Sequence, residues 1–550
     1  MGIRRQILRP VAWLAGVHAG RQMRAFLRAH RHTRQAQDGL LAALVERHAE
    51  TAFGRDHGFA SIGCYEDFAR AVPVGSYGTL RPYVQRVLNG DAEALLPRGE
   101  DVLMFSLTSG TTGEPKRIPV TRRFLSGMRR GWNITGLMAL RDHPEGWLRP
   151  ILQISSPMCE ITTPAGKPCG AISGMLAATQ KGIVRRMYVV PQAAQGIKDP
   201  AAKYYTILRC GIERDVAIIA AANPSSTIRM IETGQEHAER LIRDVSDGRL
   251  TPPGDVPGEV ARGLRFRPNA PLARRLTDGL RRDGALLPRH FWRPAVLMNW
   301  TGGTLKLYLR RLRELFGDVP IRDIGLAASE GRFSIPLADE TPEGVAEITG
   351  NFLEFIPAEE HGSPHARLLR ADELDIGAEY FLVVSNWAGL FRYDMDDRVR
   401  VTGRLGSSPI FEFLSRGVRT ANITGEKITE HQVVEAMRQA SAAAGAKVDR
   451  FVMQGRFART PYYELRIEEV EGCNAAGLAA LMDEALAALN MEYRSKRSSA
   501  RLGPIRPITL PSGALEEAEA QQIRARLGRS EQYKSQYLLA EVLEDEAQRP

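Results

Sequence analysis

One segment of the sequence has the residue types needed to hold a polyphosphate. It reads Ser106-Leu-Thr-Ser-Gly-Thr-Thr-Gly-Glu-Pro-Lys116 and contains five hydroxyl side chains, two glycines and a lysine in eleven residues. Amides and hydroxyls donate hydrogen bonds to phosphate oxygens, lysine supplies positive charge, and glycine lets the backbone approach closely. We therefore predict a phosphate-binding loop. A flexible polar turn is the alternative.

The loop differs from the phosphate loop of common kinases and GTPases. Glu114 and Pro115 separate Gly113 from Lys116, and neither serine nor threonine follows the lysine. The G-x-x-x-x-G-K-[ST] pattern requires both features, so an enzyme of that type is disfavoured. The apolar residues 102–105 directly precede the loop and predict a short strand that delivers it, a common way to present backbone amides to an anion.

The whole-chain composition is that of a soluble globular protein with more than one packed unit. The chain has 550 residues, of which 43% are hydrophobic and 25% charged, and a chain of this length exceeds one ordinary core. The net charge of +10 comes mostly from arginine and suits anionic ligands. Nucleic-acid binding is disfavoured, because no zinc finger, aromatic RNA-binding strand or long basic helix accompanies the charge.

The cysteines and the apolar segments bear on location. Five cysteines are scattered without a CxxC pair, which predicts a reduced, zinc-free, cytoplasmic protein. No stretch reaches the roughly 20 apolar residues that span a bilayer, so no integral membrane segment is expected. Residues 1–37 contain eight arginines and no acid. They predict a basic amphipathic helix that rests on the protein's own body or, alternatively, on a membrane surface.

The elements that must position the loop alternate between strand and helix. A packing helix is expected at 35–48. Residues 250–288 predict short helices and loops on the exterior, interpreted as a solvated connection, with a functional insertion as the alternative. The middle third predicts strands at 151–155 and 216–222 and helices at 227–245 and 305–316. This alternation favours an α/β architecture.

The last quarter of the chain has a different character. Residues 379–403 alternate like a β-meander, and past Arg416 a small α+β unit is expected. Helices are predicted in it at 430–444 and 475–494, and strands at 450–455 and 462–469. We therefore predict two domains, 1–415 and 416–550, with the boundary near 414–417.

The phosphate loop also carries a family resemblance. Residues 108–116 resemble the loop of the adenylate-forming superfamily, which includes acyl-CoA synthetases, luciferases and peptide-synthetase adenylation domains. The flanking segments resemble one branch, the auxin-responsive Gretchen Hagen family of acyl acid amido synthetases, in a divergent form of the bacterial type. These flanks are Val72-Pro-Val, Tyr77, Arg81-Pro-Tyr-Val-Gln-Arg86 and Lys116-Arg-Ile-Pro-Val-Thr121.

Further segments match that family in its order. They are Gly325-Leu-Ala-Ala-Ser-Glu-Gly331, Asn351-Phe-Leu-Glu-Phe-Ile-Pro357, Gly389-Leu-Phe-Arg-Tyr-Asp-Met-Asp-Asp397, Arg416, Gly425-Glu-Lys-Ile-Thr-Glu430 and Glu531-Gln-Tyr-Lys-Ser535. The resemblance covers residues 51–537. It implies an α/β fold with a large multi-subdomain N-terminal domain of the adenylate-forming type and a smaller α+β C-terminal lid domain.

The resemblance also implies an activity. An ATP-dependent ligase would activate a carboxylic acid as acyl-AMP and transfer the acyl group to an amine, expected to be an amino acid. ATP and Mg²⁺ would be required, and a monomer is compatible with this chemistry. Two alternatives stay open: a thioester-forming ligase that uses coenzyme A or a carrier protein, and a nucleotide-binding protein without catalysis.

The family assigns roles to residues of the motifs. Glu330 would bind Mg²⁺, Ser329 the α-phosphate and Asp397 the ribose hydroxyls, while Lys534 would neutralise charge during adenylation. The other expected nucleotide-binding residues are Thr108, Ser109, Gly110, Thr111, Thr112, Gly113, Lys116, Ala328, Tyr393, Arg416 and Lys427. Structural roles remain as alternatives: a helix-cap partner for Glu330, a turn residue for Asp397, and solvated surface cations for the basic residues outside the loop.

Five positions depart from the family pattern. Leu326 stands where the family has a tyrosine that packs on adenine, and Gln536-Tyr537 replaces a Pro-Arg pair. Asp394 replaces an arginine, and Asp396 replaces the glycine before Asp397. The added negative charge predicts weaker ATP binding unless a cation such as Arg392 or Arg398 compensates.

Overall fold

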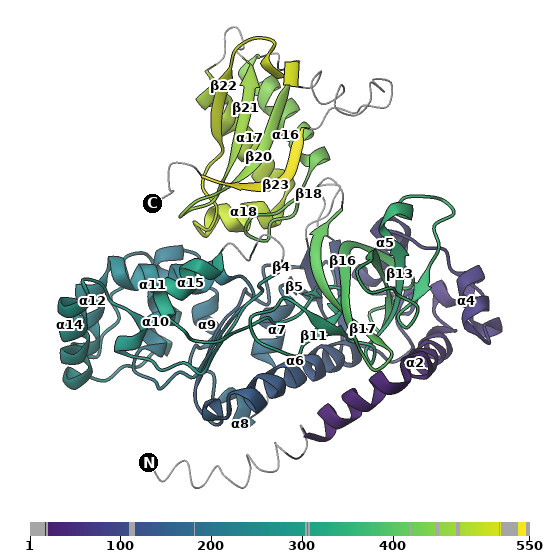
Figure 1. Cartoon of the computed structure of the whole chain (residues 1–550), viewed down its shortest axis with the longest axis horizontal. Helices are drawn as coiled ribbons and strands as arrows, with labels where there is room; N and C mark the ends of the chain where they lie inside the picture. Colours follow the sequence, from purple (N-terminus) through teal and green to yellow (C-terminus); the bar gives the residue numbers. More distant parts are fainter. Residues whose placement is uncertain are drawn as a thin grey trace. The chain divides into compact units, whose positions relative to one another are not determined.

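The computed structural model describes residues 17, 20–108, 116–180, 182–302, 305, 308–417, 420–446, 448, 450–468, 474–515, 517–518 and 537–545. The chain divides into two compact units. The large unit comprises Met1–Leu107 and Arg117–Leu414, and the small unit comprises Thr108–Lys116 and Ser415–Pro550. Figure 1 shows the ribbon of both.

A seven-stranded sheet forms one end of the large unit (Figure 1). Its strand order is β11-β12-β17-β16-β15-β13-β14, and the predicted meander is confirmed as β15 and β16. The strands are β11 (Ser334–Pro336), β12 (Gly344–Ala346), β13 (Asn351–Pro357), β14 (Leu369–Arg370), β15 (Glu379–Asn386), β16 (Tyr393–Leu405) and β17 (Ser408–Arg416). Every residue of β13 is buried, so this strand lies in the main core.

A second sheet of the large unit is parallel, in the order β3-β6-β7-β8. Its strands are β3 (Ile151–Ile154), β6 (Ile218–Ala221), β7 (Val296–Met298) and β8 (Ile321–Arg322). The helices that accompany it are α10 (Pro200–Gly211), α11 (Pro224–Glu236), α12 (Ala238–Asp247), α13 (Gly258–Gly263), α14 (Ala270–Asp283) and α15 (Leu309–Phe316). Strands alternating with helices confirm the predicted α/β architecture.

One helix prediction in this region needed correction. The helix predicted at 227–245 is two helices, because the backbone leaves the helical region at His237, with φ −117° and ψ 31°. The helices expected within 250–288 are α13 and the 14-residue helix α14, which is longer than the weak periodicity indicated. Asn269 caps that helix by accepting from the amide of Leu272, and a proline follows in its first turn. Both are helix-start signals that periodicity alone does not weigh.

A third sheet carries the strand that precedes the predicted phosphate loop. Its order is β2-β1-β5-β4, and a separate two-stranded hairpin pairs β9 with β10. The strands are β1 (Val102–Thr108), β2 (Lys116–Thr121), β4 (Ile161–Thr162), β5 (Pro168–Gly170), β9 (Ala327–Ala328) and β10 (Gly331–Arg332). The strand predicted at 102–105 is confirmed as β1, which continues to the first residue of the loop.

The remaining elements of the large unit are helices. They are α2 (Thr33–His48), α3 (Ala52–Asp56), α4 (Tyr65–Ala71), α5 (Tyr77–Leu88), α6 (Arg122–Asp142), α7 (Ile172–Ala178), α8 (Gly182–Arg185) and α9 (Gln192–Gln195), with 3-10 turns at His30–His32, Phe59–Ser61, Ala92–Ala94, Pro144–Gly146, Pro288–His290 and Ala358–Glu360. The helix predicted at 35–48 is therefore confirmed as α2.

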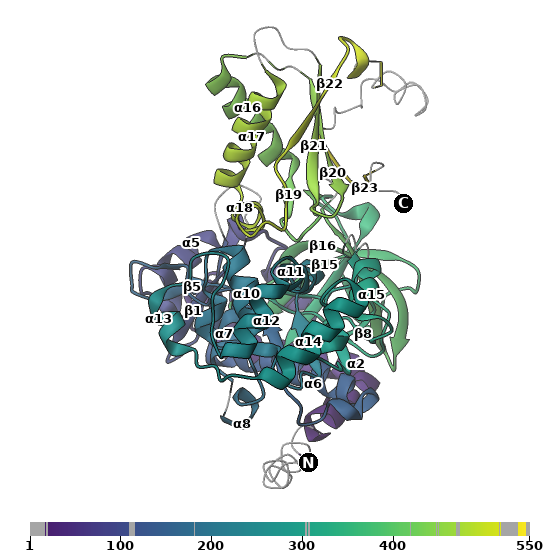
Figure 2. The ribbon, with the colours of Figure 1, turned by 90° about the vertical axis from the view of Figure 1, so that its left-hand side faces the viewer.

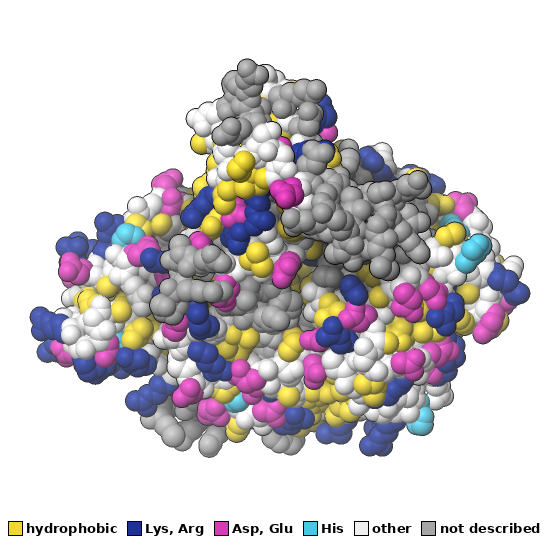
Figure 3. All heavy atoms as spheres, turned by 45° about the horizontal axis from the view of Figure 1, so that its top comes forward, with side chains coloured by type: hydrophobic (Ala, Val, Ile, Leu, Met, Phe, Trp, Pro, Cys, Tyr) yellow, Lys and Arg dark blue, Asp and Glu magenta, His cyan; other side chains and the backbone are white. Residues whose placement is uncertain are grey.

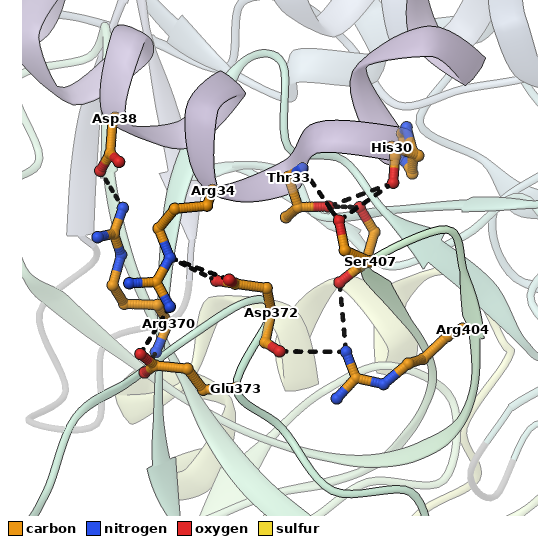
Figure 4. A network of polar contacts seen from close by, with 10 residues as sticks. His30, Thr33, Arg34, Asp38, Arg370, Asp372, Glu373, Arg404 and Ser407 are labelled. Atoms are coloured by element: carbon orange, nitrogen blue, oxygen red, sulfur yellow. Dashed lines mark hydrogen bonds and ion pairs between the residues drawn. The ribbon is translucent and has the colours of Figure 1, made fainter.

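The basic N-terminal segment packs on the protein's own body from residue 20 onward. Phe26 is 2% exposed and packs with apolar residues of α6, β11 and β12. Arg34 on α2 pairs with Asp372 at 2.9 Å and with Glu373 at 2.7 Å, and Thr33 meets the Ser408 hydroxyl at 2.6 Å. Figure 4 shows this network between the helix and the seven-stranded sheet. Of the two expected locations for this segment, a membrane surface or the protein's own body, its described part therefore packs against the protein's own body.

The small unit has the predicted α+β character. Its sheet has the order β22-β21-β20-β23, and Figure 2 shows α16 and α17 on one face of it. The elements are β18 (Thr420–Ala421), β19 (Ile428–Thr429), α16 (Glu430–Ala444), β20 (Phe451–Phe457), β21 (Tyr462–Glu468), α17 (Ala475–Leu489), α18 (Met491–Ser498), β22 (Arg506–Leu510) and β23 (Leu538–Glu544). The helix predicted at 475–494 is interrupted at Asn490, whose side chain caps α18.

Charge is unevenly spread over the face of the molecule in Figure 3. Basic side chains gather at its left-hand end, where Figure 1 places α12 and α14. Arginines 274, 275, 282 and 289 line a hollow there. Among the described residues, no helix is long and apolar enough to cross a membrane. The four cysteines in the described part of the chain are all free thiols.

Candidate functional site

The second motif forms a tight turn in the large unit. Strands β9 and β10 pair antiparallel, with Gly331 opposite Ala328 and Arg332 opposite Ala327. Ser329 and Glu330 are the two residues between these strands. The hairpin follows the carboxyl end of β8 in the parallel sheet, an edge where ligands bind in open α/β folds.

The turn lies against the end of β1. The Ser106 hydroxyl is 2.9 Å from the Ser329 hydroxyl, and the Ser329 hydroxyl donates to the carbonyl of Leu107 at 3.3 Å. Ser106 is fully buried. Two motifs that are 223 residues apart in the sequence therefore meet, and the strand that leads into the phosphate loop contacts the predicted α-phosphate ligand.

Glu330 has a buried carboxylate that accepts no hydrogen bond from the residues that the structure describes. Its exposed fraction is 0%, and neither carboxylate oxygen has a hydrogen-bond partner among the described residues. Burying a carboxylate without hydrogen-bond partners costs roughly several kcal/mol of folding free energy, because the charge loses its hydration. Such a group in a native fold calls for an explanation, and a bound cation is one that the chemistry favours.

The donor set around Glu330 fits Mg²⁺ better than a metal held wholly by protein. No group of three or more His, Cys, Asp or Glu side chains able to hold a metal occurs in the described ranges. Mg²⁺ takes most of its oxygens from water and phosphates and needs only one or two carboxylates. A single buried carboxylate therefore matches its requirements.

Asp397 is directed by a bulge in β16. Opposite β15, Asp394 pairs with Val383 and Arg398 with Phe381, so three residues of β16 oppose one residue of its neighbour. Asp396 within the bulge has a left-handed backbone with φ +58°. Asp397 is 1% exposed, whereas Asp394 and Asp396 are only partly buried. A bulge re-aims side chains, and here it separates Asp397 from the two acids beside it.

The compensating cation for these acids is not one of the two arginines expected. Arg392 pairs with Glu354 at 2.9 Å and donates to the carbonyls of Ala69 and Val72, and Arg398 pairs with Glu379. Instead, the His361 ring contacts the Asp394 carboxylate at 2.8 Å.

His361 is itself held by a ring contact. It stacks on Phe381 with centroids 3.6 Å apart and planes 9° from parallel. Burial lowers the pKa of His361, but the hydrogen bond to Asp394 and the charges of Asp394 and Asp396 outweigh it, so the pKa lies above the ordinary value. The other oxygen of Asp394 accepts from the Asp396 amide at 2.8 Å. The histidine therefore offsets the acid that holds the bulge.

In the small unit, Lys427 sits at the end of a tightly bonded loop between β18 and β19. Glu426 is fully buried and accepts from the amides of Ile423 and Thr424 at 2.8 Å each and from the Tyr463 hydroxyl. Lys427 has φ +46°, and its carbonyl accepts from the Asn490 side chain at 3.2 Å. The loop conformation is thus fixed by Glu426.

The remaining predicted site residues are placed only in part. Lys116 begins β2 and is 8% exposed, and Tyr393 begins β16 and is fully buried. Thr108 ends β1 and Arg416 ends β17, with side chains outside the described set. Ser109, Gly110, Thr111, Thr112, Gly113 and Lys534 lie outside the described residues. Ala328 ends β9.

Sequence reasoning did not single out several residues that hold this site. Ser106 was noted only as a donor in the loop, and Asn351 only as part of a strand motif. Glu426 was noted only as part of the segment 425–430, and Asn386 carried no local signal. Leu326, which replaces an adenine-stacking tyrosine, packs against the main core instead.

The architecture defines a class of fold. A large α/β unit, in which the end of β1 contacts the turn that bears Glu330, is combined with a small α+β unit. This matches the predicted fold class.

The chain belongs to the GH3 family, as the resemblance predicted. Family models match in order: the GH3 family N-terminal domain over residues 22–321, the central domain over 345–416 and the C-terminal domain over 431–542. At the level of the family, the chain is a ligase.

Named relatives agree with this assignment. The chain is 24% identical to indole-3-acetic acid-amido synthetase GH3.3 of Arabidopsis thaliana, with 88% of this chain and 85% of that protein covered. It is 24% identical to jasmonoyl-L-amino acid synthetase JAR6 of Nicotiana attenuata, with 74% and 73% covered. Among solved structures, GH3.15 acyl acid amido synthetase shares the fold, with a TM-score of 0.66, 21% identity and 94% of each chain covered.

Proposed function

We propose that this protein activates a carboxylic acid with ATP and transfers the acyl group to an amine. In the first half-reaction, a carboxylate oxygen attacks the α-phosphorus of ATP and pyrophosphate leaves. In the second, the amine nitrogen attacks the acyl carbon of the acyl-AMP, AMP leaves, and the nitrogen loses a proton to give an amide. ATP is thereby converted to AMP and pyrophosphate.

The contact between Ser106 and Ser329 is the observation that carries this proposal. It joins the strand that leads into the phosphate loop to the turn that bears Glu330. A site for adenylation must spread charge over three phosphates while holding two anions together. The hydroxyl-rich loop would provide the donors for phosphate oxygens, and the buried carboxylate of Glu330 would hold the metal that neutralises them.

Each predicted residue keeps a proposed role. Residues 108–113 and Lys116 would cradle the phosphates, and Ser329 with Ala328 would line the α-phosphate. Asp397 would accept from the ribose hydroxyls near Tyr393. Arg416 and Lys427 would contact the adenylate. Residues 416–550 would act as a mobile lid on the domain 1–415 and supply Lys534 to the first half-reaction.

Mg²⁺ would be held by Glu330 together with oxygens of the nucleotide. When bound, it supplies positive charge that stabilises the pentacoordinate α-phosphorus and the departing pyrophosphate. The chain's own part is to orient that carboxylate and exclude water from it. The full burial of Glu330 supports both tasks.

The acceptor is proposed to be an amino acid, because one relative named above is an amido synthetase and another is a jasmonoyl-L-amino acid synthetase. A thiol acceptor is the second candidate. A binding protein without catalysis is disfavoured on one specific observation: His361 offsets Asp394, so the extra acids next to Asp397 are not left uncompensated. We propose a cytoplasmic enzyme, consistent with the reduced, scattered cysteines, that acts as a monomer.

Two measurements test the proposal. Exchange of labelled pyrophosphate into ATP, screened across aryl, indolic and fatty acids, should appear with at least one acid, and a protein that shows exchange with none would not be an adenylating enzyme. Release of AMP that depends on added amino acids, and not on coenzyme A, should then identify the acceptor. The reverse dependence would establish the thioester reaction.

A further inference from the structure

Two asparagine side chains form hydrogen bonds to the backbone of the hairpin that carries Glu330. Asn351 begins β13 and Asn386 ends β15, and the two residues are direct partners in the register of these strands. Asn351 is 4% exposed and Asn386 is fully buried. Polar side chains at such depth in a sheet need hydrogen bonds to be tolerated. Both find these bonds on the β9–β10 hairpin.

The amide groups bind the hairpin backbone at two points. The Asn386 side chain donates to the carbonyl of Glu330 at 2.7 Å, and the Asn351 side chain donates to the carbonyl of Arg332 at 2.6 Å. Asn386 also donates to the side-chain oxygen of Asn351 at 3.3 Å. The turn is therefore held on one side by this pair and on the other by Ser106.

The orientation of both amides follows from their neighbours. The Asn386 oxygen accepts from the Ala388 amide at 2.9 Å, and the Asn351 nitrogen lies 3.4 Å from a Glu347 carboxylate oxygen. A flipped Asn351 would set its oxygen against two acceptors, which is unfavourable. The donors must therefore point at the hairpin.

Close packing around the turn restricts movement of the hairpin backbone. A Cβ on Gly331 would come within 2.9 Å of the Asn351 side-chain oxygen and 3.0 Å of Phe333. The hairpin backbone thus lies directly on the asparagine pair. A glycine at this position allows that approach.

We propose that Asn351 and Asn386 are positioning residues that fix the direction of the Glu330 carboxylate, so that it meets a divalent cation without rearrangement. The inference rests on the proposed function of Glu330. The pair touches neither metal nor nucleotide and acts through the backbone of the turn. Partners that orient a metal ligand change metal affinity by about 10- to 100-fold when removed.

The test compares the metal affinity of three proteins. Asn386→Asp replaces the donating amide by an acceptor oxygen and keeps the acceptor for Ala388. Asn299→Asp is the matched control, because Asn299 is also fully buried and donates to a backbone carbonyl, that of Ala221, at 2.8 Å. Binding of Mn²⁺ would be measured by electron paramagnetic resonance in the presence of α,β-methylene-ATP, whose methylene bridge prevents release of pyrophosphate and therefore transfer of AMP to an acid.

The expected results separate positioning from general stability. Asn386→Asp should weaken Mn²⁺ binding about 10-fold and raise by a similar factor the Mg²⁺ concentration needed for pyrophosphate exchange. Asn299→Asp should lower the melting temperature comparably but leave the metal affinity as in the wild type. If Asn386→Asp does not fold, Asn386→Ala removes the donor without adding charge and carries the same expectation.

The possible failures are distinguishable. Metal affinity equal to that of the wild type in the Asn386 variant, or an equal loss in the Asn299 variant, would overturn the positioning role. A wild-type protein that shows neither nucleotide-dependent Mn²⁺ binding nor exchange would instead overturn the proposed function.

Discussion

The Ser106 and Ser329 hydroxyls lie 2.9 Å apart and join the end of β1 to the β9–β10 turn. The two residues belong to motifs that are far apart in the sequence, and the hydrogen bond between them connects these motifs directly. A displacement of the strand that leads into the predicted phosphate loop should change the position of Glu330, because Glu330 directly follows the bonded serine in the sequence. The contact is therefore a direct target for mutagenesis.

Replacing Ser106 by alanine should reduce kcat/KM for ATP by roughly fivefold, since one buried hydrogen bond contributes about 1 kcal/mol. The measurement is pyrophosphate exchange at varied ATP. Ser408→Ala is a matched control, because it breaks a buried hydroxyl pair with Thr33 in the same unit. An equal change in both variants would show that the Ser106 contact is only structural.

Replacing Glu330 by glutamine should separate stability from activity. Removing a buried charge that lacks hydrogen bonds should raise the free energy of unfolding, measured without nucleotide, by roughly 1 to 3 kcal/mol. Pyrophosphate exchange should fall by about 100-fold or more, because the metal loses its protein ligand. A destabilised variant that retains exchange would remove Glu330 from the metal site.

Replacing Asp396 by glycine should stabilise the protein. The left-handed backbone at φ +58° is unfavourable for a residue with a side chain, and relief of that strain, less the entropy of glycine, is worth roughly 0.5 to 1 kcal/mol. Urea unfolding would measure the gain. Asp396→Asn tolerates the same backbone but lacks the charge and should change stability little. A less stable glycine variant would show that the Asp396 side chain outweighs the strain.

The pair of His361 and Asp394 should make stability depend on pH. Because the pKa of His361 is raised, the contribution of the pair is complete below the ordinary pKa of 6.5 and is lost as pH rises through the higher folded-state pKa. The difference in free energy of unfolding between wild type and His361→Gln should therefore shrink from about pH 5.5 to about pH 8.5. A difference that is constant over this range would contradict the pairing of charges.

Replacing Lys534 by alanine should affect the two half-reactions unequally. Adenylate formation should fall by about 100-fold, because the charge that the lysine balances develops at the α-phosphate. Reaction of preformed acyl-AMP with the amine should remain close to that of the wild type. Rapid-quench measurement of each step separates them, and equal losses would contradict the proposed role.

Local patterns predicted much of the fold. Period-two alternation identified β15 and β16, and the helix predicted at 430–444 is α16 with its observed limits. In the structure, Thr429 and Gln432 form a capping box at its start. Periodicity failed where one residue breaks a continuous pattern, as at His237 and Asn490. There the backbone conformation depends on packing between the two helices, which spacing along the chain does not encode.

The site was predictable only where its residues belong to motifs. Ser329, Glu330 and Asp397 stand in segments with recognisable spacing. Asn386 follows an apolar run and looks like an ordinary strand end, because its partner, the Glu330 carbonyl, is 56 residues away. The cation that pairs with Asp394 was predicted wrongly for the same reason. Proximity in sequence suggested Arg392 and Arg398, whereas the contact comes from His361, which lies far away in the sequence.

The stacking of His361 on Phe381 and its ion pair with Asp394 restrict how this chain can change. An arginine introduced at position 394 would face an imidazole already fixed in place, so two cations would meet and the amide of Asp396 would lose its acceptor. A substitution at position 361 or 394 therefore requires a compensating substitution at the other position. Positions 361 and 394 should vary together among close relatives, and a graft of the plant-like motif into this protein needs both.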